Sequence, residues 1–217
     1  MVNICAAHKK KIIRYNYSGR NDEKIKYIVI HDTGNRARGA DAEAHYRYFN
    51  SGNRGASAHY FVDDRSILQL VEDCHASWHC GDGKGRYGIT NRNSIGVEIC
   101  VNADGDYEKA LANTLQLVRH LMEKHAVPLE RVVRHYDASR KLCPRSMSED
   151  NWSRWQEFKK NLEDKPVIEL QKAVAVLHER GIINTPEYWL KNAVKGKMLK
   201  GEYAALLIQR TAEFIEP

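Results

Sequence analysis

Two histidines and one cysteine are the residues whose types and spacing point to chemistry. His31 and His135 each end a short apolar run, and Cys143 follows His135 by eight residues. Two imidazoles and a thiolate form a good ligand set for zinc, and three protein ligands leave the fourth tetrahedral position open, as in catalytic zinc sites. The spacing is not that of a zinc finger. The set therefore predicts a catalytic zinc centre, provided that the fold brings the three side chains together.

A glutamate and a lysine accompany this ligand set. Glu98 interrupts an alternating strand pattern over residues 94–101, which puts it on the face opposite Ile95, Val97, Ile99 and Val101. A buried carboxylate on such a strand needs a partner or a chemical role. Lys141 lies two residues before Cys143, so its positive charge is expected near the metal.

Several elements must position these residues. Residues 27–31 and 131–135 predict buried strands that end in the two histidines, and residues 79–93, with four glycines, predict a loop. The other expected elements are strands at 58–62, 67–71 and 94–101, and helices at 40–50, from Asp106 to about His125, and after Ser148. This order predicts an α/β fold, with a mixed central β-sheet flanked by helices and a zinc site in a surface groove.

Asp164-Lys165-Pro166 is the expected domain boundary. It separates a domain of residues 1–163 from a small all-helical domain of residues 164–217, in which three short helical patterns follow one another. So short a chain buries a marginal core, so we expect this domain to pack tightly on itself or to form a homodimer.

The net charge of +6 falls on residues 1–160, because residues 161–217 hold eight basic and eight acidic side chains. A basic domain suits a polyanion, but no signature of a nucleic-acid-binding module accompanies the charge. No apolar run approaches the ~20 residues of a membrane span. The N-terminus does not resemble a secretion signal, so we expect the protein to be made in the cytoplasm and released by another agent.

Five short motifs occur in a familiar order. They are Ile30-His31-Asp32-Thr33, Ser57-Ala58-His59-Tyr60, Trp78-His79-Cys80-Gly81, Asn93-Ser94-Ile95-Gly96-Val97-Glu98, and His135-Tyr136-Asp137 with Lys141-Leu142-Cys143-Pro144. From about Lys26 to Pro144 the chain resembles the type 2 N-acetylmuramoyl-L-alanine amidase family, which shares its fold with peptidoglycan recognition proteins and bacteriophage lysozyme-type amidases. Arg145 departs from the pattern, because the family usually has glycine there.

The resemblance implies roles for the individual residues. It makes His31, His135 and Cys143 the zinc ligands, and Glu98, Lys141 and Tyr60 the catalytic candidates. Zinc lowers the pKa of a bound water from ~16 toward ~7. We expect Glu98 to accept and later deliver the proton. Lys141 would stabilise the oxyanion, and Tyr60 would donate to it or orient the water.

Three further residues receive expectations at the edge of this site. His79 should contact the substrate, and Trp78 should support the loop beside the substrate groove. Asp137 either orients a metal-bound histidine through a hydrogen bond or has a structural role in its loop.

The resemblance implies hydrolysis of peptidoglycan at the amide bond between N-acetylmuramic acid and L-alanine. A phage or prophage endolysin, released when a holin opens the membrane, fits the lack of a signal. The alternatives are a host autolysin or recycling amidase, and a non-catalytic wall-recognition module on the same fold. Such modules commonly lack the metal cysteine, which is present here as Cys143. A nucleic-acid partner rests on charge alone. The C-terminal domain would bind the wall or mediate dimerisation.

Overall fold

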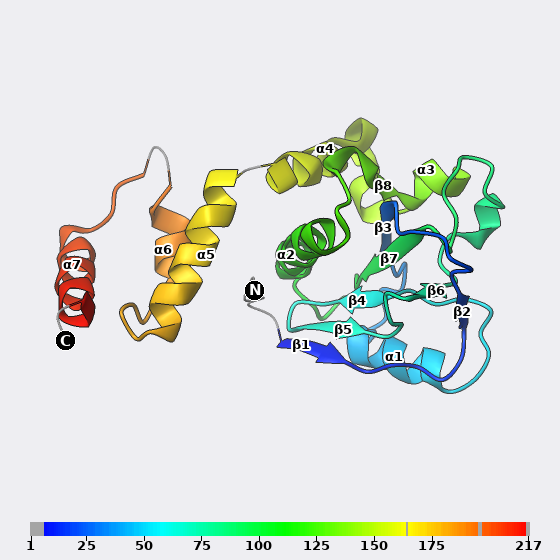
Figure 1. Ribbon diagram of the computed structural model, residues 1–217, viewed down its shortest axis with the longest axis horizontal. Coiled ribbons are helices and arrows are strands. Elements are labelled where there is room, and N and C mark those ends of the chain that lie inside the picture. Colours follow the sequence, from blue (N-terminus) through cyan, green and yellow to red (C-terminus); the bar gives the residue numbers. More distant parts are fainter. Residues whose placement is uncertain (1–6, 164, 195–196, 216–217) are drawn as a thin grey trace. The chain divides into compact units, whose positions relative to one another are not determined.

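The computed structural model describes residues 7–163, 165–194 and 197–215, and it divides into two compact units. The first unit ends at Leu162 and the second begins at Glu163 (Figure 1).

A mixed six-stranded sheet forms the centre of the first unit, as the sequence predicts. Its strands, in spatial order, are β1 (Ala7–Lys10), β5 (Ser66–Gln69), β4 (Tyr60–Val62), β7 (Ser94–Ile99), β3 (Tyr27–Asp32) and β8 (Val132–Arg134). β4 and β5 pair antiparallel as a hairpin, whereas the other four neighbouring pairs are parallel. β2 (Tyr17–Gly19) and β6 (His75–Ser77) form a separate antiparallel pair.

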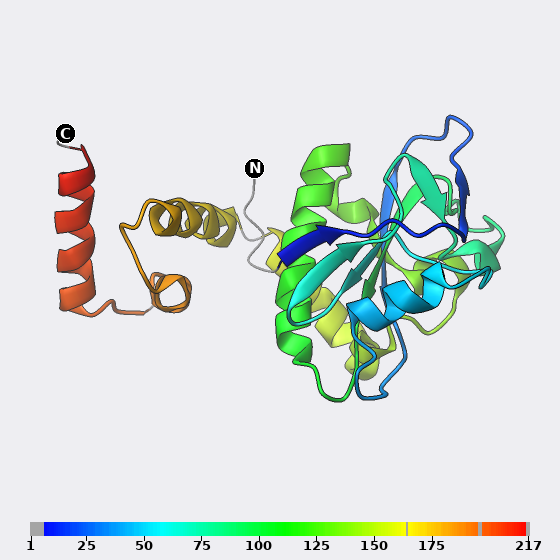
Figure 2. The same ribbon diagram turned by 90° about the horizontal axis from the view of Figure 1, so that it is seen from below.

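Helices cover both faces of this sheet (Figures 1 and 2). α2 (Tyr107–His125) and α4 (Glu149–Glu163) bury their apolar residues against one face. α1 (Ala42–Asn50) packs on the other face, against Phe61, Leu68 and Leu70. Asp106 caps α2 as expected, because its side chain accepts a hydrogen bond from the Lys109 N–H and so satisfies a free donor of the first turn.

The register of β3 against β7 decides which residues share the second face. His31 lies directly opposite Glu98, so both side chains project to the side of the sheet on which α1 packs. The intervening positions pair Ile30 with Val97 and belong to the core beneath α2. The predicted separation of Glu98 from its apolar neighbours is therefore confirmed.

Tyr60 lies on the wrong face for the role that the sequence assigned to it. It pairs with Val97, is 2% exposed, and is part of the core beneath α2. Its hydroxyl donates to Asp73 Oδ1 at 2.7 Å. The prediction that Tyr60 acts at the reaction site is wrong, because alternation along β4 directs it away from His31 and Glu98.

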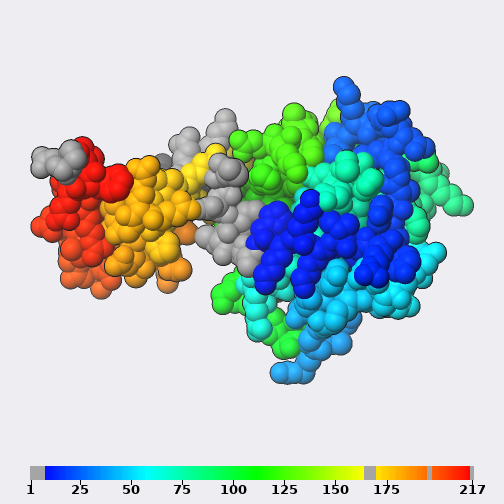
Figure 3. Space-filling view, turned by 60° about the horizontal axis from the view of Figure 1, so that its bottom comes forward, coloured from blue at the N-terminus to red at the C-terminus, as the bar shows by residue number. Residues whose placement is uncertain are grey.

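Three strands, β1, β2 and β6, were not predicted from the sequence because they lack an apolar pattern. β1 has the sequence Ala-His-Lys-Lys and lies at an edge of the sheet, where backbone pairing with β5 is sufficient to form it. β2 and β6 have three residues each, too few for a periodicity to appear. The stretch that carries β1 and β2, in blue in Figure 3, lies at the surface of this unit.

The strand expected to end at His135 stops at Arg134. His135 instead begins the short helix α3 (His135–Ser139). The carboxylate of Asp137 accepts from the Arg134 backbone N–H, Nε and Nη2, which fixes the change from strand to helix.

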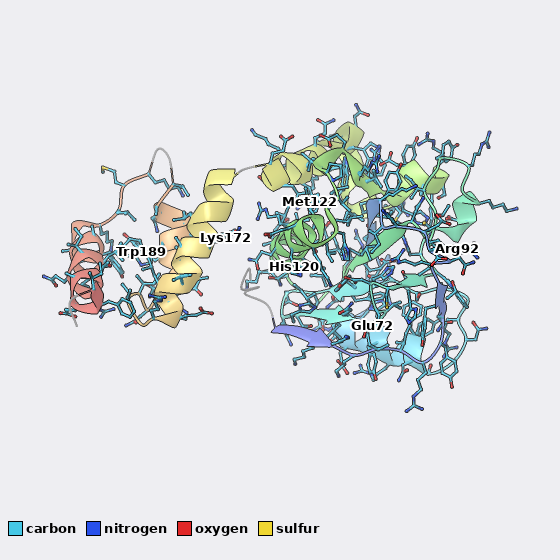
Figure 4. The ribbon with its side chains drawn as sticks, viewed as in Figure 1. Glu72, Arg92, His120, Met122, Lys172 and Trp189 are labelled. Carbon is cyan, nitrogen blue, oxygen red and sulfur yellow. The ribbon has the colours of Figure 1, made fainter. Side chains whose placement is uncertain are left out.

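The second unit consists of three helices in its described residues: α5 (Lys165–Glu179), α6 (Pro186–Asn192) and α7 (Gly201–Ile215). Their small core contains Val174, Ile182, Ile183 and Trp189, which is labelled in Figure 4. In neither unit do the described residues form a helix with the length and apolar character needed to cross a membrane.

Candidate metal centre

The structure brings His31, His135 and Cys143 together. One potential ligand atom from each lies within 4.8 Å of the others. The two Nδ1 atoms are 3.1 Å apart, and Cys143 Sγ lies 3.8 Å from His31 Nδ1. All three residues are buried, with 5% exposure or less. A cluster of donors thus lies where β3 and α3 meet.

Local hydrogen bonds hold the cysteine against the histidines. The Tyr136 N–H donates to the Cys143 carbonyl at 3.0 Å, which folds the loop after α3 back onto the start of that helix. Asp32, next to His31 on β3, accepts from the Ser146 N–H at 2.7 Å. These two bonds tie both sides of Cys143 to the elements that carry the histidines.

The outer nitrogen of His135 is held by Asp82, in the 3-10 turn η1 (Gly81–Gly83). His135 Nε2 lies 2.8 Å from Asp82 Oδ1, and Ser139 donates to the other carboxylate oxygen at 3.1 Å. Although partial burial opposes ionisation, the hydrogen bond from His135 lowers the pKa of Asp82. Because an ionised carboxylate only accepts, His135 carries its proton on Nε2 and presents a lone pair at Nδ1.

The outer nitrogen of His31 meets another histidine. His31 Nε2 lies 3.0 Å from Nδ1 of His79, and the two rings meet edge to face. Burial lowers the pKa of both histidines well below the usual value, so both rings are neutral.

Glu98 stands beside the cluster with an unused oxygen. Its Oε1 lies 4.0 Å from His31 Nδ1, and its buried Oε2 has no hydrogen-bond partner among the described residues. Burial and the nearby Asp32 raise the pKa of Glu98 to about 8, against the opposing effect of Lys141. A buried carboxylate oxygen without a partner is costly, so its retention here suits a group that exchanges a proton.

The donor set fits a zinc-like ion. Ligands of a tetrahedral zinc ion lie about 3.3–3.6 Å from one another, given the usual bond lengths to nitrogen and sulfur. The observed 3.1 and 3.8 Å are close to this spacing. Two imidazole lone pairs that face one another repel, and a cation between them would turn that repulsion into attraction. The mixed nitrogen and sulfur donors favour zinc over the hard cations magnesium and calcium.

Lys141 is exposed near the cluster, and its charge acts on Glu98, Cys143 and His135. Trp78 is half-buried, and its indole N–H donates to Ser18 of β2 at 3.3 Å. It therefore joins β2 to the start of the loop.

The structure bears on two further expectations about the site, those for His79 and Asp137. His79 was expected to contact the substrate, but it is 9% exposed and both ring nitrogens already have partners, His31 and Ser94. Its ring nitrogens therefore have no hydrogen bond left for a substrate, and substrate contact by His79 stays a prediction. For Asp137 the structural alternative holds, since its carboxylate is occupied by Arg134.

Asp82 and Ser94 contact the histidines of the site but were not predicted to do so from the sequence. Asp82 lies between two glycines in Gly81-Asp82-Gly83, a pattern typical of a tight turn and not of a metal site. The Cβ atom of an alanine at Gly83 would lie 2.1 Å from the Ala138 carbonyl oxygen, so this glycine lets the turn approach α3. A glycine on each side of an acidic residue near a ligand motif was the available signal.

The chain is similar to several known proteins. The family model described as N-acetylmuramoyl-L-alanine amidase matches residues 21–146. N-acetylmuramoyl-L-alanine amidase CwlH of Bacillus subtilis (strain 168) is 38% identical in an alignment of 177 residues that covers 70% of this chain and 70% of CwlH. XlyA of the same organism is 45% identical over 133 residues, which cover 61% of this chain and 42% of XlyA. The structure of a mutant endolysin from Bacillus subtilis aligns with a TM-score of 0.65 and 42% identity, over 72% of this chain and 99% of that one.

Gly83→Ala tests the role of the turn. The added Cβ forces the turn away from α3 and moves Asp82 from His135. We expect a loss of about 1–3 kcal/mol in the free energy of unfolding. Affinity for a divalent metal should fall roughly 10-fold or more. Chemical denaturation and competition with a chelator measure the two effects.

Gly19→Ala is the matched control, because its nearest neighbouring atom would lie 3.6 Å away, in ordinary contact. Equal metal affinity in the two variants and the parent chain would show that the turn does not support the site.

Proposed function

The chain belongs to the N-acetylmuramoyl-L-alanine amidase family, and from this membership we propose that it is a zinc-dependent peptidoglycan hydrolase. The bond cleaved is the amide between N-acetylmuramic acid and L-alanine of the stem peptide. The observation that carries the proposal is the convergence of His31, His135 and Cys143 beside the unpartnered oxygen of Glu98. The site combines a metal-binding donor set with an adjacent proton acceptor.

His31 and His135 would hold the ion through Nδ1, and Cys143 through Sγ. When bound, zinc would supply a Lewis acid and a readily deprotonated water at neutral pH. Burial keeps bulk water from the three donors, which strengthens the attraction between them and a cation.

Glu98 would act as the general base. The β3–β7 register holds its carboxyl group beside His31. Burial favours the neutral acid there, whereas the charge of a bound cation would favour the carboxylate, which can accept a proton from the attacking water. The same carboxyl group would then return that proton to the leaving amine of L-alanine. This transfer converts a poor leaving group into a neutral amine.

Lys141 would stabilise negative charge on the carbonyl oxygen in the transition state. It is exposed, so it can reach a bound substrate, and its charge already acts on the buried residues of the site. A fixed positive charge at the developing oxyanion lowers the barrier. Tyr60 has no part in this step, because it lies across the sheet.

The lytic role rests on the relatives. The likeness to the Bacillus subtilis endolysin favours degradation of the intact wall, which for a phage-encoded protein would follow release through a holin. The binding-only alternative is disfavoured because Cys143 and Glu98 are both present, whereas a recognition module has no need of a proton acceptor at a metal.

Mass spectrometry of fragments released from purified peptidoglycan tests the proposed bond. Incubation with the zinc-loaded chain should yield stem peptides with free L-alanine amino termini and no new reducing sugar ends. New reducing ends, or cuts within the peptide, would assign the protein a different hydrolytic activity.

Glu98→Gln separates chemistry from metal binding. The amide keeps the shape of the side chain but cannot accept the proton, so turnover should fall roughly 10²- to 10⁴-fold while zinc remains bound. Release of amino termini and metal analysis of the purified variant give the two readouts.

Tyr60→Phe is the control on the opposite face of the same sheet. It loses the hydrogen bond to Asp73, at a cost of about 1.5–3 kcal/mol in the free energy of unfolding, but should keep its turnover. Near-normal turnover of Glu98→Gln, or a comparable loss in Tyr60→Phe, would remove Glu98 from its assigned role.

For the C-terminal helical unit we propose association, either with a wall polymer or with a second copy of the chain. The observation that supports it is a set of exposed apolar side chains on α7, namely Leu206, Ile208, Phe214 and Ile215. Exposed apolar surface of this kind is typical of interaction sites.

The double substitution Ile208→Glu and Ile215→Glu in the full chain tests this role. Loss of sedimentation as a dimer would identify a dimer surface, and loss of cell-wall pull-down would identify a wall-binding surface. If the substituted chain sediments and binds walls like the parent, α7 has neither role.

A further inference from the structure

His79 is a buried histidine that the proposed reaction does not use. Both of its ring nitrogens have partners: Nδ1 lies 3.0 Å from His31 Nε2, and Nε2 lies 3.0 Å from Ser94 Oγ. Its ring also lies against Gly96, where an added Cβ would come within 2.5 Å of the His79 Cγ. The ring is therefore fixed in position as well as in hydrogen bonding.

The direction of these hydrogen bonds follows from one carbonyl group. Ser94 Oγ lies 2.5 Å from the Thr90 carbonyl oxygen, which can only accept, so the Ser94 hydroxyl donates its proton there. Its oxygen then accepts from His79 Nε2–H. His79 Nδ1 consequently has a lone pair and must accept from His31 Nε2–H. His31 Nδ1 is left without a proton, facing His135 and Cys143.

The backbone around Ser94, which takes part in these hydrogen bonds, is anchored by Arg20. Arg20 is 7% exposed, and its guanidinium donates to the carbonyls of Asp73, Arg92 and Ser94. Arg92, labelled in Figure 4, belongs to the loop that leads into β7. The backbone around Ser94 is thus anchored independently of the metal ligands.

We propose that Thr90, Ser94 and His79 form a hydrogen-bonded relay that fixes the tautomer and orientation of His31, and that His79 is a positioning residue of the metal centre. The proposal rests on the metal site of the proposed function. The relay acts on His31 as Asp82 acts on His135. The residues that bind the outer nitrogen, Nε2, of both histidines therefore come from the loop of residues 79–93 and the first residue of β7.

The cost of losing the relay follows from the tautomers. Without an acceptor at His79, His31 can place its proton on Nδ1, where it blocks a ligand position and must be displaced before a metal binds. Removal of such an outer partner typically weakens metal affinity 10- to 100-fold.

Three substitutions in the full chain test the relay, with zinc affinity measured by competition with a chromogenic chelator. His79→Phe keeps a flat ring over Gly96 but offers no acceptor, and should weaken zinc binding roughly 10- to 100-fold. His79→Asn places a carbonyl oxygen near the Nδ1 position and should restore most of the affinity. Ser94→Ala frees His79 to change tautomer and should give a smaller loss.

Ser77→Ala is the matched control. Ser77 is also fully buried and also bonds a buried histidine, with Oγ 2.7 Å from His59 Nδ1, but that histidine does not touch a ligand. It should lose stability without losing zinc affinity. If His79→Phe binds zinc as tightly as the parent, or if His79→Asn is no better than His79→Phe, the relay does not position His31.

A second readout needs no metal. Long-range proton–nitrogen NMR correlations of the histidine rings should show both His79 and His31 protonated at Nε2 in the metal-free parent chain. A proton on His79 Nδ1 would overturn the relay even if the hydrolase activity is present. A parent chain that shows the expected tautomers but binds no zinc would instead contradict the proposed function.

Discussion

The opposition of two imidazole lone pairs is the constraint on which the site depends. His31 and His135 present their Nδ1 atoms to each other at 3.1 Å, with the Cys143 sulfur close by. The two lone pairs repel each other without a cation, and a hydrogen bond to the outer nitrogen of each ring holds that ring in place against the repulsion. Asp82 holds His135 and His79 holds His31. The architecture of the first unit can be understood as the means of keeping these outer partners in place.

The sheet contributes to the site by placing the residues of the apolar core and the residues of the site on opposite faces. Along β3 and β7, alternate residues face α2 and α4 and form the apolar core, while the residues between them carry the site. Backbone pairing of the two parallel strands is sufficient to place Glu98 beside His31. A slip of one residue would exchange the two faces, so the hydrophobic pattern that fixes the register also positions the carboxylate.

The residue types and the apolar runs were sufficient to predict that His31, His135 and Cys143 come together, and they also predicted the mixed sheet and the unusual position of Glu98. They failed for Tyr60 because a sequence motif does not show on which face of the sheet a residue lies. Alternation along β4 directs Tyr60 toward the core. They failed for His79 and Asp82 because outer partners are defined by contacts between distant segments. Those contacts depend on close approaches such as that of Gly83 to Ala138 and of Gly96 to His79. The edge strand β1 was missed because backbone pairing alone forms it.

X-ray absorption spectroscopy of the zinc-loaded chain counts the atoms around the metal, and so tests whether His31, His135 and Cys143 hold it. We expect four-coordinate zinc with one sulfur at about 2.3 Å and three nitrogen or oxygen atoms at about 2.0–2.1 Å, two of which are imidazole nitrogens. Loss of the sulfur contribution in Cys143→Ala would complete the assignment. A spectrum without sulfur, or one with a fourth protein ligand that closes the site, would contradict it.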